Sequence, residues 1–359
     1  MKAVVLVGGE GTRLRPLTLT TPKQMLPIVG VAMIERVLGH LAAHGIDEAV
    51  LSLGYLPDAF LEAYPDGTAA GVRLAYAVEP EPLDTAGAVR FAADFAGVDE
   101  TFVVVNGDVL TDLDVSALIA FHRGHGAEGT IALHPVADPS AFGVVPTDDQ
   151  GRVTAFVEKP PRDEAPTNLI NAGTYVLEPS LLRRIPAGRR VSIERETFPA
   201  SVRDGGLFAL ADEAYWLDTG TPSAYLQANR DLVEGRRGPG APFPGAVDRG
   251  DHLWVVGSPV LAGSLSGACF VADGSVVADG ATVTDSVLGA GTVVEAGATV
   301  TGSVLLDGSR VAANSVVESS ILGPGSTVGE RCQVHAVSVL GADAVVASGS
   351  VVDGERVPG

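Results

Sequence analysis

This 359-residue sequence has few cysteines and no long apolar run. The two cysteines, Cys269 and Cys332, show neither metal-ligand spacing nor the pattern of a disulfide framework, which fits a reducing compartment. The apolar run at residues 3–7 is too short for a secretory signal. No stretch approaches the roughly 20 apolar residues that a membrane-spanning helix needs. We therefore expect a cytoplasmic protein.

Positive charge is also in short supply, because 24 lysines and arginines stand against 44 aspartates and glutamates, for a net charge of −20. This balance argues against nucleic acids and anionic membranes as partners. It still permits a phosphate ligand that is held by a few local cations. The only lysines are Lys2, Lys23 and Lys159, and the last two fall inside the motifs described below, where a compact ammonium group has a use.

The part of the chain before the Gly/Pro-rich stretch alternates short apolar strands with amphipathic helical patterns. We predict strands at 2–7, 48–53, 73–78 and 101–105, and helices at 33–44 and 86–95. Strands that are apolar throughout are typical of a mostly parallel sheet covered by helices, and such sheets bind ligands at the carboxyl ends of their strands. Because the chain is longer than one core usually is, we predict a first α/β domain, with a Rossmann-like sheet, at residues 1–234.

Residues 235–250 are dense in glycine and proline without periodicity, which predicts a linker. From 251 to 359 aromatic residues almost vanish, and an apolar residue recurs every six positions, which is typical of a parallel β-helix built from hexapeptide rungs. The pattern takes one step of five at 283–288 and breaks between 306 and 322. The predicted inner row is Val271, Val277, Val283, Leu288, Val294, Val300, Leu306, Leu322, Val328, Val334, Leu340, Val346 and Val352.

The segment at residues 6–27, LVGGEGTRLRPLTLTTPKQMLP, follows the first predicted strand. Its glycines allow the backbone to approach a triphosphate and to donate N–H groups to it. The segment is neither a Walker A loop nor a G-x-G-x-x-G turn. Arg13 and Lys23 can neutralise the charge on phosphoryl oxygens during an in-line displacement. The segment therefore predicts a nucleotide-binding loop.

A second polar motif, Asn106-Gly107-Asp108, ends a predicted strand. Mg²⁺ usually takes one or two carboxylates together with phosphate oxygens. A carboxylate at the end of a parallel strand, near a nucleotide loop, can serve this purpose. Asp108 can therefore hold Mg²⁺, although a lone aspartate in this context is more often a turn or helix-cap residue.

The order G-G-x-G-T-R-L-x-P-L-T followed by P-K resembles the fingerprint of the sugar-1-phosphate nucleotidyltransferases, most closely that of the mannose-1-phosphate guanylyltransferases. The resemblance covers nearly the whole chain and implies a left-handed β-helix. It implies that Asp218 joins Asp108 in holding Mg²⁺, and that Arg13, Lys23 and Asp108 are catalytic. The nucleotide-binding residues that it implies are Leu6, Gly8, Gly9, Gly11, Thr12, Arg13, Lys23, Glu79, Pro82, Asp84, Thr85 and Gly107.

The same resemblance implies a sugar-phosphate site. Glu158 suits the sugar hydroxyl groups, Lys159 suits the phosphate, and Asn171 can both donate and accept hydrogen bonds. Phe142-Gly143-Val144-Val145 resembles a segment in which the glycine lets the backbone face the sugar. The implied set is Gly143, Glu158, Lys159, Asn171 and Gly173.

The implied reaction is attack of the sugar-phosphate oxygen on the α-phosphorus of an NTP, with pyrophosphate as the leaving group. No side-chain nucleophile is needed, because the attacking phosphate is already ionised. Mg²⁺ bridges the phosphates, while Arg13, Lys23 and Lys159 stabilise charge and align the reactants. GTP and mannose 1-phosphate are the expected substrates.

Two positions depart from the guanylyltransferase pattern. Gln24 follows Lys23 where a proline is common, and a glutamine there resembles the thymidylyltransferases. Asp84 stands where P-L-G-T-A-G has its first glycine. An aspartate beside the base can accept from the N1–H and N2–H₂ of guanine, or it can be a loop residue that disturbs the usual contact. A thymidylyltransferase, or another NDP-sugar or NDP-cyclitol pyrophosphorylase, is therefore the alternative.

Two further readings come from other classes of protein. An acyltransferase that uses the β-helix would need a catalytic histidine between coils, and His335 occupies an ordinary rung position there. A non-catalytic regulatory subunit would be expected to have lost one of Arg13, Lys23, Asp108 and Asp218, yet all four are present.

Five other histidines have no apparent carboxylate partner and are read as bystanders: His40, His44, His122, His125 and His134. Exposed rungs of a β-helix need cover, which predicts a homo-oligomer.

Overall fold

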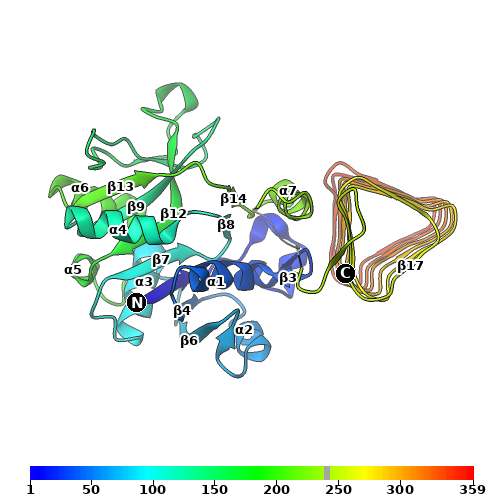
Figure 1. The fold of residues 1–359 in the computed structure, drawn as a ribbon, viewed down its shortest axis with the longest axis horizontal. Coiled ribbons are helices and arrows are strands. Elements are labelled where there is room, and N and C mark those ends of the chain that lie inside the picture. The colour runs from blue at the N-terminus through cyan, green and yellow to red at the C-terminus, as the bar shows by residue number, and fades with distance from the viewer. Residues whose placement is uncertain (238–242) are drawn as a thin grey trace. The chain divides into compact units, whose positions relative to one another are not determined.

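The computed structural model describes residues 1–237 and 243–359, and these form two compact units (Figure 1). Unit 1 consists of Met1–Gly9 and Ile34–Trp216, and unit 2 of Glu10–Met33 and Leu217–Gly359. The chain therefore passes between the units three times. The linear division at 1–234, 235–250 and 251–359 stays a prediction, and residues 238–242 of its linker lie outside the described part of the chain.

Unit 1 contains a ten-stranded sheet in the order β11-β10-β12-β7-β1-β4-β6-β5, with β9 beside β12 and β13 beside β9. The central strands β7, β1, β4 and β6 are parallel to one another, as their continuous apolar sequences predict. The ten strands of this sheet are β1 (Lys2–Leu6), β4 (Glu48–Leu53), β5 (Thr68–Ala69), β6 (Val72–Val78), β7 (Phe102–Asn106), β9 (Gly129–Pro135), β10 (Gly143–Val144), β11 (Val157–Glu158), β12 (Leu169–Leu177) and β13 (Leu207–Ala211). Strands β8 (Val109–Thr111) and β14 (Trp216–Asp218) form a separate two-stranded sheet.

The helices of unit 1 pack apolar faces against this sheet. Val89 and Ala92 of α3 join Val4, Val50 and Val104 of the central strands in one buried core. The helices are α1 (Met33–Ala43), α2 (Asp58–Ala63), α3 (Asp84–Phe95), α4 (Val115–His125), α5 (Pro179–Leu182) and α6 (Phe198–Arg203), with shorter turns η4 (Arg162–Glu164) and η5 (Ile193–Thr197). The strands and helices predicted in this part of the chain are confirmed, with ends shifted by one or two residues.

Unit 2 begins with three short helical turns and a hairpin, η1 (Thr12–Leu14), η2 (Leu17–Leu19), η3 (Lys23–Met25), β2 (Pro27–Ile28) and β3 (Val31–Ala32). Helix α7 (Pro222–Val233) follows Asp218 closely. Thr221 caps its first turn by accepting a hydrogen bond from Ala224 N, at 3.2 Å, and Pro222 occupies the first helical position, where no N–H is needed. Tyr225 and Asn229 of α7 bond the backbone of Pro27 and Val29 and so hold the hairpin.

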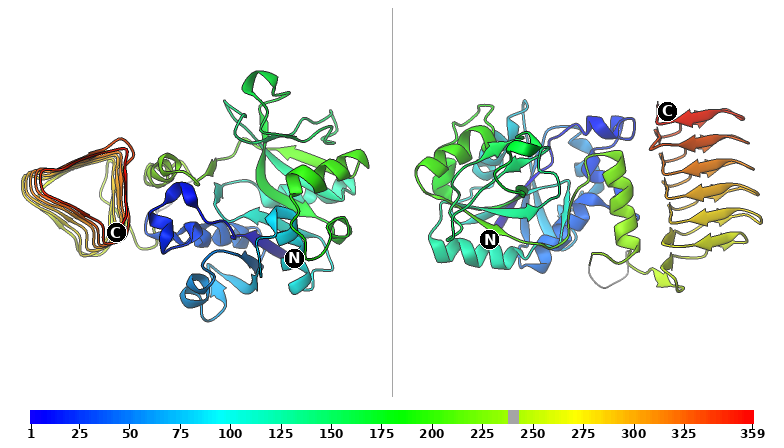
Figure 2. Two further views of the ribbon diagram at one scale, coloured as in Figure 1. Left: turned by 180° about the vertical axis from the view of Figure 1, so that it is seen from behind. Right: turned by 90° about the horizontal axis from the view of Figure 1, so that it is seen from above.

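The rest of unit 2 is a left-handed parallel β-helix with a triangular outline (Figure 1) and stacked coils (Figure 2). Its first sheet is β15 (Val247–Asp248), β16 (Leu253–Val255), β19 (Cys269–Val271), β22 (Val287–Leu288), β25 (Val304–Leu305), β28 (Ile321–Leu322), β31 (Val339–Leu340) and β34 (Arg356–Val357). Its second is β17 (Val260–Leu261), β20 (Val276–Val277), β23 (Val293–Val294), β26 (Arg310–Val311), β29 (Thr327–Val328) and β32 (Val345–Val346). Its third is β18 (Ser264–Ser266), β21 (Thr282–Thr284), β24 (Thr299–Thr301), β27 (Val316–Glu318), β30 (Gln333–His335) and β33 (Val351–Asp353).

The inner row of the β-helix is continuous, so the predicted break between 306 and 322 is wrong. Leu305, not Leu306, points into the core, and Val311 and Val317 carry the row on to Leu322. The step of five at Val283–Leu288 recurs at the same corner of the next two coils, from Val300 to Leu305 and from Val317 to Leu322, and becomes a step of six from Val334 to Leu340. The predicted inner row, which assumed a strict period of six, went out of register because two sides of each of the coils with the step of five take six residues and the third takes five.

The outer face of the first sheet is apolar and buried, unlike an ordinary exposed rung. Val287, Val304, Ile321 and Val339 are at most 5% exposed. Within unit 2 the Trp254 ring nitrogen donates to the carbonyl of Val233 at the end of α7 (3.2 Å). These contacts attach the β-helix to α7, the helix that follows Asp218. In the described residues no helix has the length and apolar composition of a membrane span.

Candidate active site

The carboxyl ends of four parallel strands converge in unit 1. Leu6 at the end of β1 accepts from Gly107 N at 2.9 Å, and Ser52 of β4 accepts from Val7 N at 3.1 Å. Glu79, just beyond β6, donates its backbone N–H to Leu53 at 2.8 Å. These bonds bring the start of the glycine loop, the Asn106–Asp108 turn and the segment after β6 to one edge of the sheet, where such folds bind ligands.

Glu79 holds the segment that leads into α3. One oxygen of its carboxylate accepts from the Ser52 hydroxyl and the other from Leu83 N, both at 3.0 Å. The first oxygen also lies 3.3 Å from the position that a Cβ on Gly8 would occupy. The glycine loop therefore passes directly beside this carboxylate. Gly8 and Glu79 thus lie side by side at this edge of the sheet, and their contact with a nucleotide stays a prediction.

Asp84 begins α3 in the left-handed conformation, with φ of 60°. Aspartate tolerates this region better than most residues, so it can replace a glycine here without breaking the turn. One of its oxygens accepts from Thr85 N at 2.8 Å, and the other lies 3.2 Å from Arg195 and 3.8 Å from Arg190. Both oxygens of Asp84 are therefore engaged within unit 1.

Thr85 ties the start of α3 to η5. Its hydroxyl donates to Glu194 at 2.8 Å and accepts from Ile193 N at 2.8 Å. Ser192 caps η5 by accepting from Arg195 N. Glu194 and Arg195 were not predicted from the sequence, although serine followed by acidic residues is the usual signal of a helix start.

The Asn106-Gly107-Asp108 turn leaves little room for a side chain at its centre. A Cβ on Gly107 would lie 2.6 Å from a methyl group of Val7 and 3.1 Å from the Leu6 carbonyl oxygen. The turn also lies against β12, because a Cβ on Gly173 would be 2.6 Å from the side-chain nitrogen of Asn106. Asn106 and Gly107, which precede Asp108, thus lie between the start of the glycine loop and the β12 irregularity at Asn171 to Tyr175.

Glu158 and Gly143 pair across β10 and β11, at the edge of the same sheet. A Cβ on Gly143 would be 3.0 Å from a Glu158 oxygen and 2.7 Å from the Phe156 ring. Lys159 follows with φ of 50°, and its ammonium lies 3.5 Å from Glu158. Its side chain is 63% exposed, which leaves the ammonium accessible to a phosphate.

Asn171 uses its amide in the local fold. Its side-chain nitrogen donates to the Tyr175 hydroxyl at 2.8 Å, and its oxygen accepts from Gly173 N at 3.1 Å. Tyr175 is fully buried, and burial raises the pKa of its hydroxyl far above the usual value. Asn171 therefore shapes the bulge in β12 at Gly173. Its predicted hydrogen bonds to a sugar stay a prediction.

In unit 2 the two ends of the glycine-loop motif meet. A Cβ on Gly11 would lie 3.0 Å from the Lys23 Cβ, and the Gly11 carbonyl accepts from the Thr18 hydroxyl at 2.8 Å. The lysine stem is thus packed against the loop despite its separation from Gly11 along the chain. Gln24, the departure from the family pattern, is buried, and its carbonyl oxygen has no hydrogen-bond partner within the described part of the chain.

Arg13 and Asp218 also lie together in unit 2. The Asp218 carboxylate accepts from Gly220 N at 2.8 Å, and a Cβ on Gly220 would be 2.7 Å from the Arg13 guanidinium and 2.9 Å from that carboxylate. Gly220 was not a predicted site residue, yet its bare Cα makes room for both groups. Its position two residues after the predicted metal ligand Asp218 was the signal in the sequence.

Each unit gathers its own share of the predicted residues. Unit 1 brings together Leu6, Gly8, Glu79, Thr85, Gly107 and Asp108, with Gly143, Glu158, Lys159, Asn171 and Gly173 along β10 to β12, and also carries Gly9, Pro82 and Asp84. Unit 2 brings together Gly11, Arg13, Lys23 and Asp218, and carries Thr12. Among the described residues, no group of three or more His, Cys, Asp or Glu forms a metal cage. Mg²⁺ needs no such cage, since one or two carboxylates with substrate phosphates suffice.

Two histidines do have carboxylate partners, contrary to the prediction. His122 is buried between the Thr130 hydroxyl at 2.8 Å and Glu178 at 3.1 Å. His44 lies 3.6 Å from Asp114. Burial, the largest effect, lowers the pKa of His122 despite the nearby carboxylate. Neither histidine is among the residues at the strand ends, so both belong to the scaffold.

The glycine loop after β1, the acidic turn after β7 and the polar edge at β10 to β12 are the features that the sequence predicts for an α/β nucleotidyltransferase. Residues 2–235 match the family model described as nucleotidyl transferase, and residues 265–358 match the model described as GMPPB C-terminal domain. The chain belongs to the nucleotidyl transferase family.

Curated relatives and solved structures agree with this membership. The chain is 43% identical over 79% of its length to a mannose-1-phosphate guanylyltransferase of Mycobacterium tuberculosis, and the match covers 80% of that protein. It is 44% identical over 63% of its length to a mannose-1-phosphate guanyltransferase of Emericella nidulans and spans 62% of that relative. Among solved structures, HddC from Yersinia pseudotuberculosis, also solved in complex with GMP-PN, matches 64% of this chain and 99% of its own, at 28% identity and a TM-score of 0.56.

Proposed function

We propose that this nucleotidyltransferase joins GTP to mannose 1-phosphate and yields GDP-mannose and pyrophosphate. The observation that carries the proposal is the 43% identity to the M. tuberculosis mannose-1-phosphate guanylyltransferase over most of both chains. The intact loop, acidic turn and Glu158-Lys159 pair support it, because each has a use in this reaction. The relative that was solved with GMP-PN supports a guanine nucleotide.

In the proposed reaction an oxygen of the sugar phosphate attacks the α-phosphorus of GTP. The new P–O bond forms as the bond between the α-phosphorus and the bridging oxygen breaks, and that oxygen leaves with pyrophosphate. Lys159 and Glu158 orient the acceptor, and the backbone of the glycine loop holds the triphosphate. Arg13 and Lys23 stabilise the charge that spreads over the phosphoryl oxygens.

Asp108 and Asp218 would hold the magnesium ion. The fit rests on the donor set, since each unit presents a carboxylate beside a phosphate-binding element, and on Arg13 lying beside Asp218. When bound, Mg²⁺ neutralises phosphate oxygens and aligns the leaving group. The carboxylate of Asp218 is fixed for this purpose by the N–H of Gly220.

We also propose that Asp84 anchors the base-proximal loop and does not read guanine. Its two oxygens are already engaged, one by Thr85 N and one by Arg195 and Arg190. This favours the loop role over direct acceptance from the guanine N–H groups. In this proposal Asp84 holds the Arg195 guanidinium, and that guanidinium supplies the hydrogen-bond donors next to the start of α3.

Two wider features of the protein are also proposals. The net charge of −20 and the substrates proposed above fit a cytoplasmic enzyme. Exposed valines on the outer faces of the β-helix, Val260, Val345 and Val351, support a homo-oligomer in which these faces are covered.

The test is pyrophosphate release from GTP and mannose 1-phosphate with Mg²⁺, in the wild type and in two variants. Asp108→Asn and Asp218→Asn each remove one metal carboxylate, so we expect turnover to fall by about 10²-fold or more while thermal unfolding changes little. Asp149→Asn, at an exposed turn, is the matched control and should keep full activity. Full activity in either site variant would contradict the assignment.

A further inference from the structure

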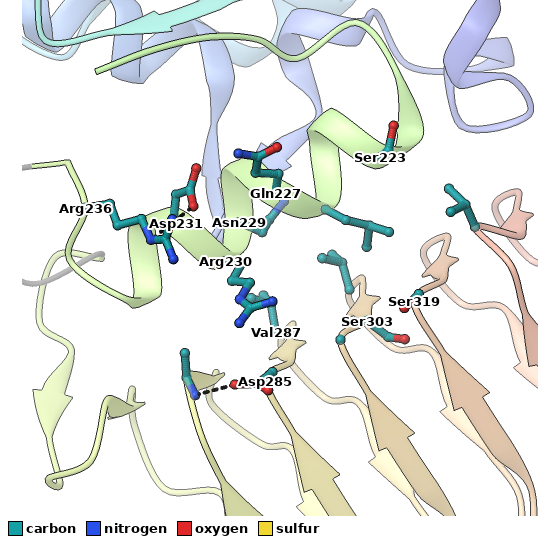
Figure 3. A pocket seen from close by; sticks show the side chains of 15 residues that line it. Ser223, Gln227, Asn229, Arg230, Asp231, Arg236, Asp285, Val287, Ser303 and Ser319 are labelled. Carbon is teal, nitrogen blue, oxygen red and sulfur yellow. Dashed lines mark hydrogen bonds and ion pairs between the residues drawn. The ribbon is translucent and has the colours of Figure 1, made fainter. Parts of the chain in front are cut away.

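A cavity of about 410 Å³ lies within unit 2, between α7 and the β-helix (Figure 3). Its size is within the range of ligand sites, roughly 300–1,000 Å³. Its walls include none of the residues assigned above to the nucleotide, the metal or the sugar phosphate. The cavity is therefore separate from the proposed catalytic residues.

Two periodic rows of residues line this cavity, and of the labelled α7 side chains Arg230 points towards the β-helix (Figure 3). On α7 the residues Ser223, Gln227 and Arg230 recur every three to four positions and so share one face of the helix. On the β-helix Asp285, Gly302 and Ser319 each directly follow a strand of the third sheet and so occupy the same corner of successive coils. A helical turn rises about 5.4 Å and neighbouring strands are about 4.8 Å apart, so the two rows have similar repeats.

The corner row keeps the cavity open because its members are small or polar. Asp285, Gly302 and Ser319 all adopt left-handed backbone conformations, with φ of 49°, 56° and 45°. This conformation turns the chain from the third sheet into the first. At Gly302 and Ser319 little side-chain volume projects towards α7, and Leu226 and Val304 add apolar wall on either side.

The polar groups in the wall have hydrogen-bonding capacity left for a ligand. Arg230 binds Glu234 through its Nε at 2.6 Å, which leaves its two terminal amino groups to donate. Asp285 uses one oxygen to accept from Ala268 N at 3.0 Å. The Arg230 side chain points towards Asp285 (Figure 3), and the charge of Asp285 adds to the larger effect of the bond to Glu234 in raising the Arg230 pKa.

We propose that this cavity is a second, non-catalytic sugar site that binds a hexose ring. A guanidinium, a carboxylate, an amide and a hydroxyl together offer donors and acceptors for ring hydroxyl groups, and Leu226 and Val304 suit the C–H faces of the ring. The opposing charges of Arg230 and Asp285 favour a neutral ring over a triphosphate. The hexose can belong to a free sugar, a sugar phosphate or an NDP-sugar.

The site has a direct connection to the proposed catalytic segment. Helix α7 starts at Pro222, shortly after Asp218, and only the short segment from Thr219 to Thr221 lies between them. A sugar on the Ser223–Gln227–Arg230 face therefore contacts the helix that carries the Asp218 turn. This inference stands on the cavity itself and does not depend on the proposed reaction.

Equilibrium dialysis of the full chain with radiolabelled mannose, mannose 1-phosphate and GDP-mannose tests the proposal by counting ligand bound per chain at saturation. The double variant Gln227→Leu/Arg230→Leu removes polar groups from the α7 wall. Arg310→Leu is the matched control, since Arg310 and Arg230 are both 53% exposed and each pairs with one glutamate. Ser319→Phe fills the cavity from the opposite wall and guards against misfolding of the double variant.

We expect the double variant and Ser319→Phe to bind one equivalent fewer than the wild type of at least one of the three ligands, while Arg310→Leu binds as the wild type does. Loss with free mannose identifies the ring alone as the ligand, and loss confined to a phosphorylated form identifies that form. Equal binding of all three ligands in wild type and cavity variants would overturn the proposal. If the proposed catalytic residues bound none of these ligands, the cavity variants would still bind one equivalent fewer than the wild type. Failure of the proposed reaction is therefore distinguishable from failure of this proposal.

Discussion

Gly220 and Arg13 approach so closely that no side chain fits between them. A Cβ on Gly220 would lie 2.7 Å from the Arg13 guanidinium and 2.9 Å from the Asp218 carboxylate. The Arg13 nitrogen and the Asp218 oxygen are the ends of side chains, and these ends can move aside when a methyl group is added at Gly220. A substitution at Gly220 therefore displaces the proposed phosphate and metal ligands while the fold stays intact.

Gly220→Ala should lower kcat roughly 10- to 100-fold, because small misplacements of aligned groups are costly in a displacement reaction. The midpoint of thermal unfolding should change little. Pyrophosphate release and calorimetric unfolding measure the two effects separately.

Gly124→Ala is the matched control for this substitution. Gly124 lies in α4, and no atom comes within 4 Å of its added Cβ. Alanine should raise the free energy of unfolding by about 0.5–1 kcal/mol and leave the rate unchanged. A large rate loss in Gly124→Ala, or full activity in Gly220→Ala, would contradict the account.

Acidification should destabilise the protein through His122. Burial lowers its pKa in the fold, so the folded chain keeps the ring neutral while the unfolded chain takes up a proton as pH falls through about 6.5. The unfolded state then binds more protons, and stability that is present above this pH is lost below it. The slope from this one residue cannot exceed about 1.4 kcal/mol per pH unit.

Urea unfolding at pH 7.5 and pH 5.5 measures this effect. His122→Gln should show a smaller loss of unfolding free energy between the two pH values than the wild type shows. His125→Asn, which replaces an exposed histidine at the end of α4, should behave as the wild type does. The same loss in His122→Gln and wild type would exclude His122 as the source.

Asp84→Asn tests whether Asp84 is a loop anchor. Asparagine also tolerates the left-handed conformation and can still accept from Thr85 N, but it weakens the ion pair with Arg195. We expect preference for GTP over other nucleotides to be retained, with KM for GTP raised a few-fold. Loss of the preference for GTP at unchanged stability would instead show that Asp84 contacts the base.

Local patterns in the sequence predicted much of the fold. The β-helix followed from one apolar residue every six, and the strand ends of unit 1 followed from apolar runs that stop at Gly8 and Asp108. The inner row went wrong at Leu306 because the third side of the coil is shorter than the other two. No local rule distinguishes Leu305 from Leu306, since both are apolar and nearly or fully buried.

The site was less predictable where contacts join distant segments. The ion pair of Asp84 with Arg195 joins segments far apart in the sequence, and so does the bond between Thr85 and Glu194. His122 reaches Glu178 through the packing of α4 on the sheet. The sequence identifies each residue as polar, but only the folded chain shows which partner neutralises it. Gly220 likewise has a meaning only once Arg13 is seen beside it.

The central claim is tested most directly by pyrophosphate release with Mg²⁺, across ATP, CTP, GTP, UTP and dTTP, against mannose, glucose and galactose 1-phosphates. The account predicts strong turnover with GTP and mannose 1-phosphate and weak turnover with every other pair. Preference for a different pair would contradict the proposed specificity. Absence of turnover across the whole matrix, with a folded protein, would contradict the proposed reaction itself.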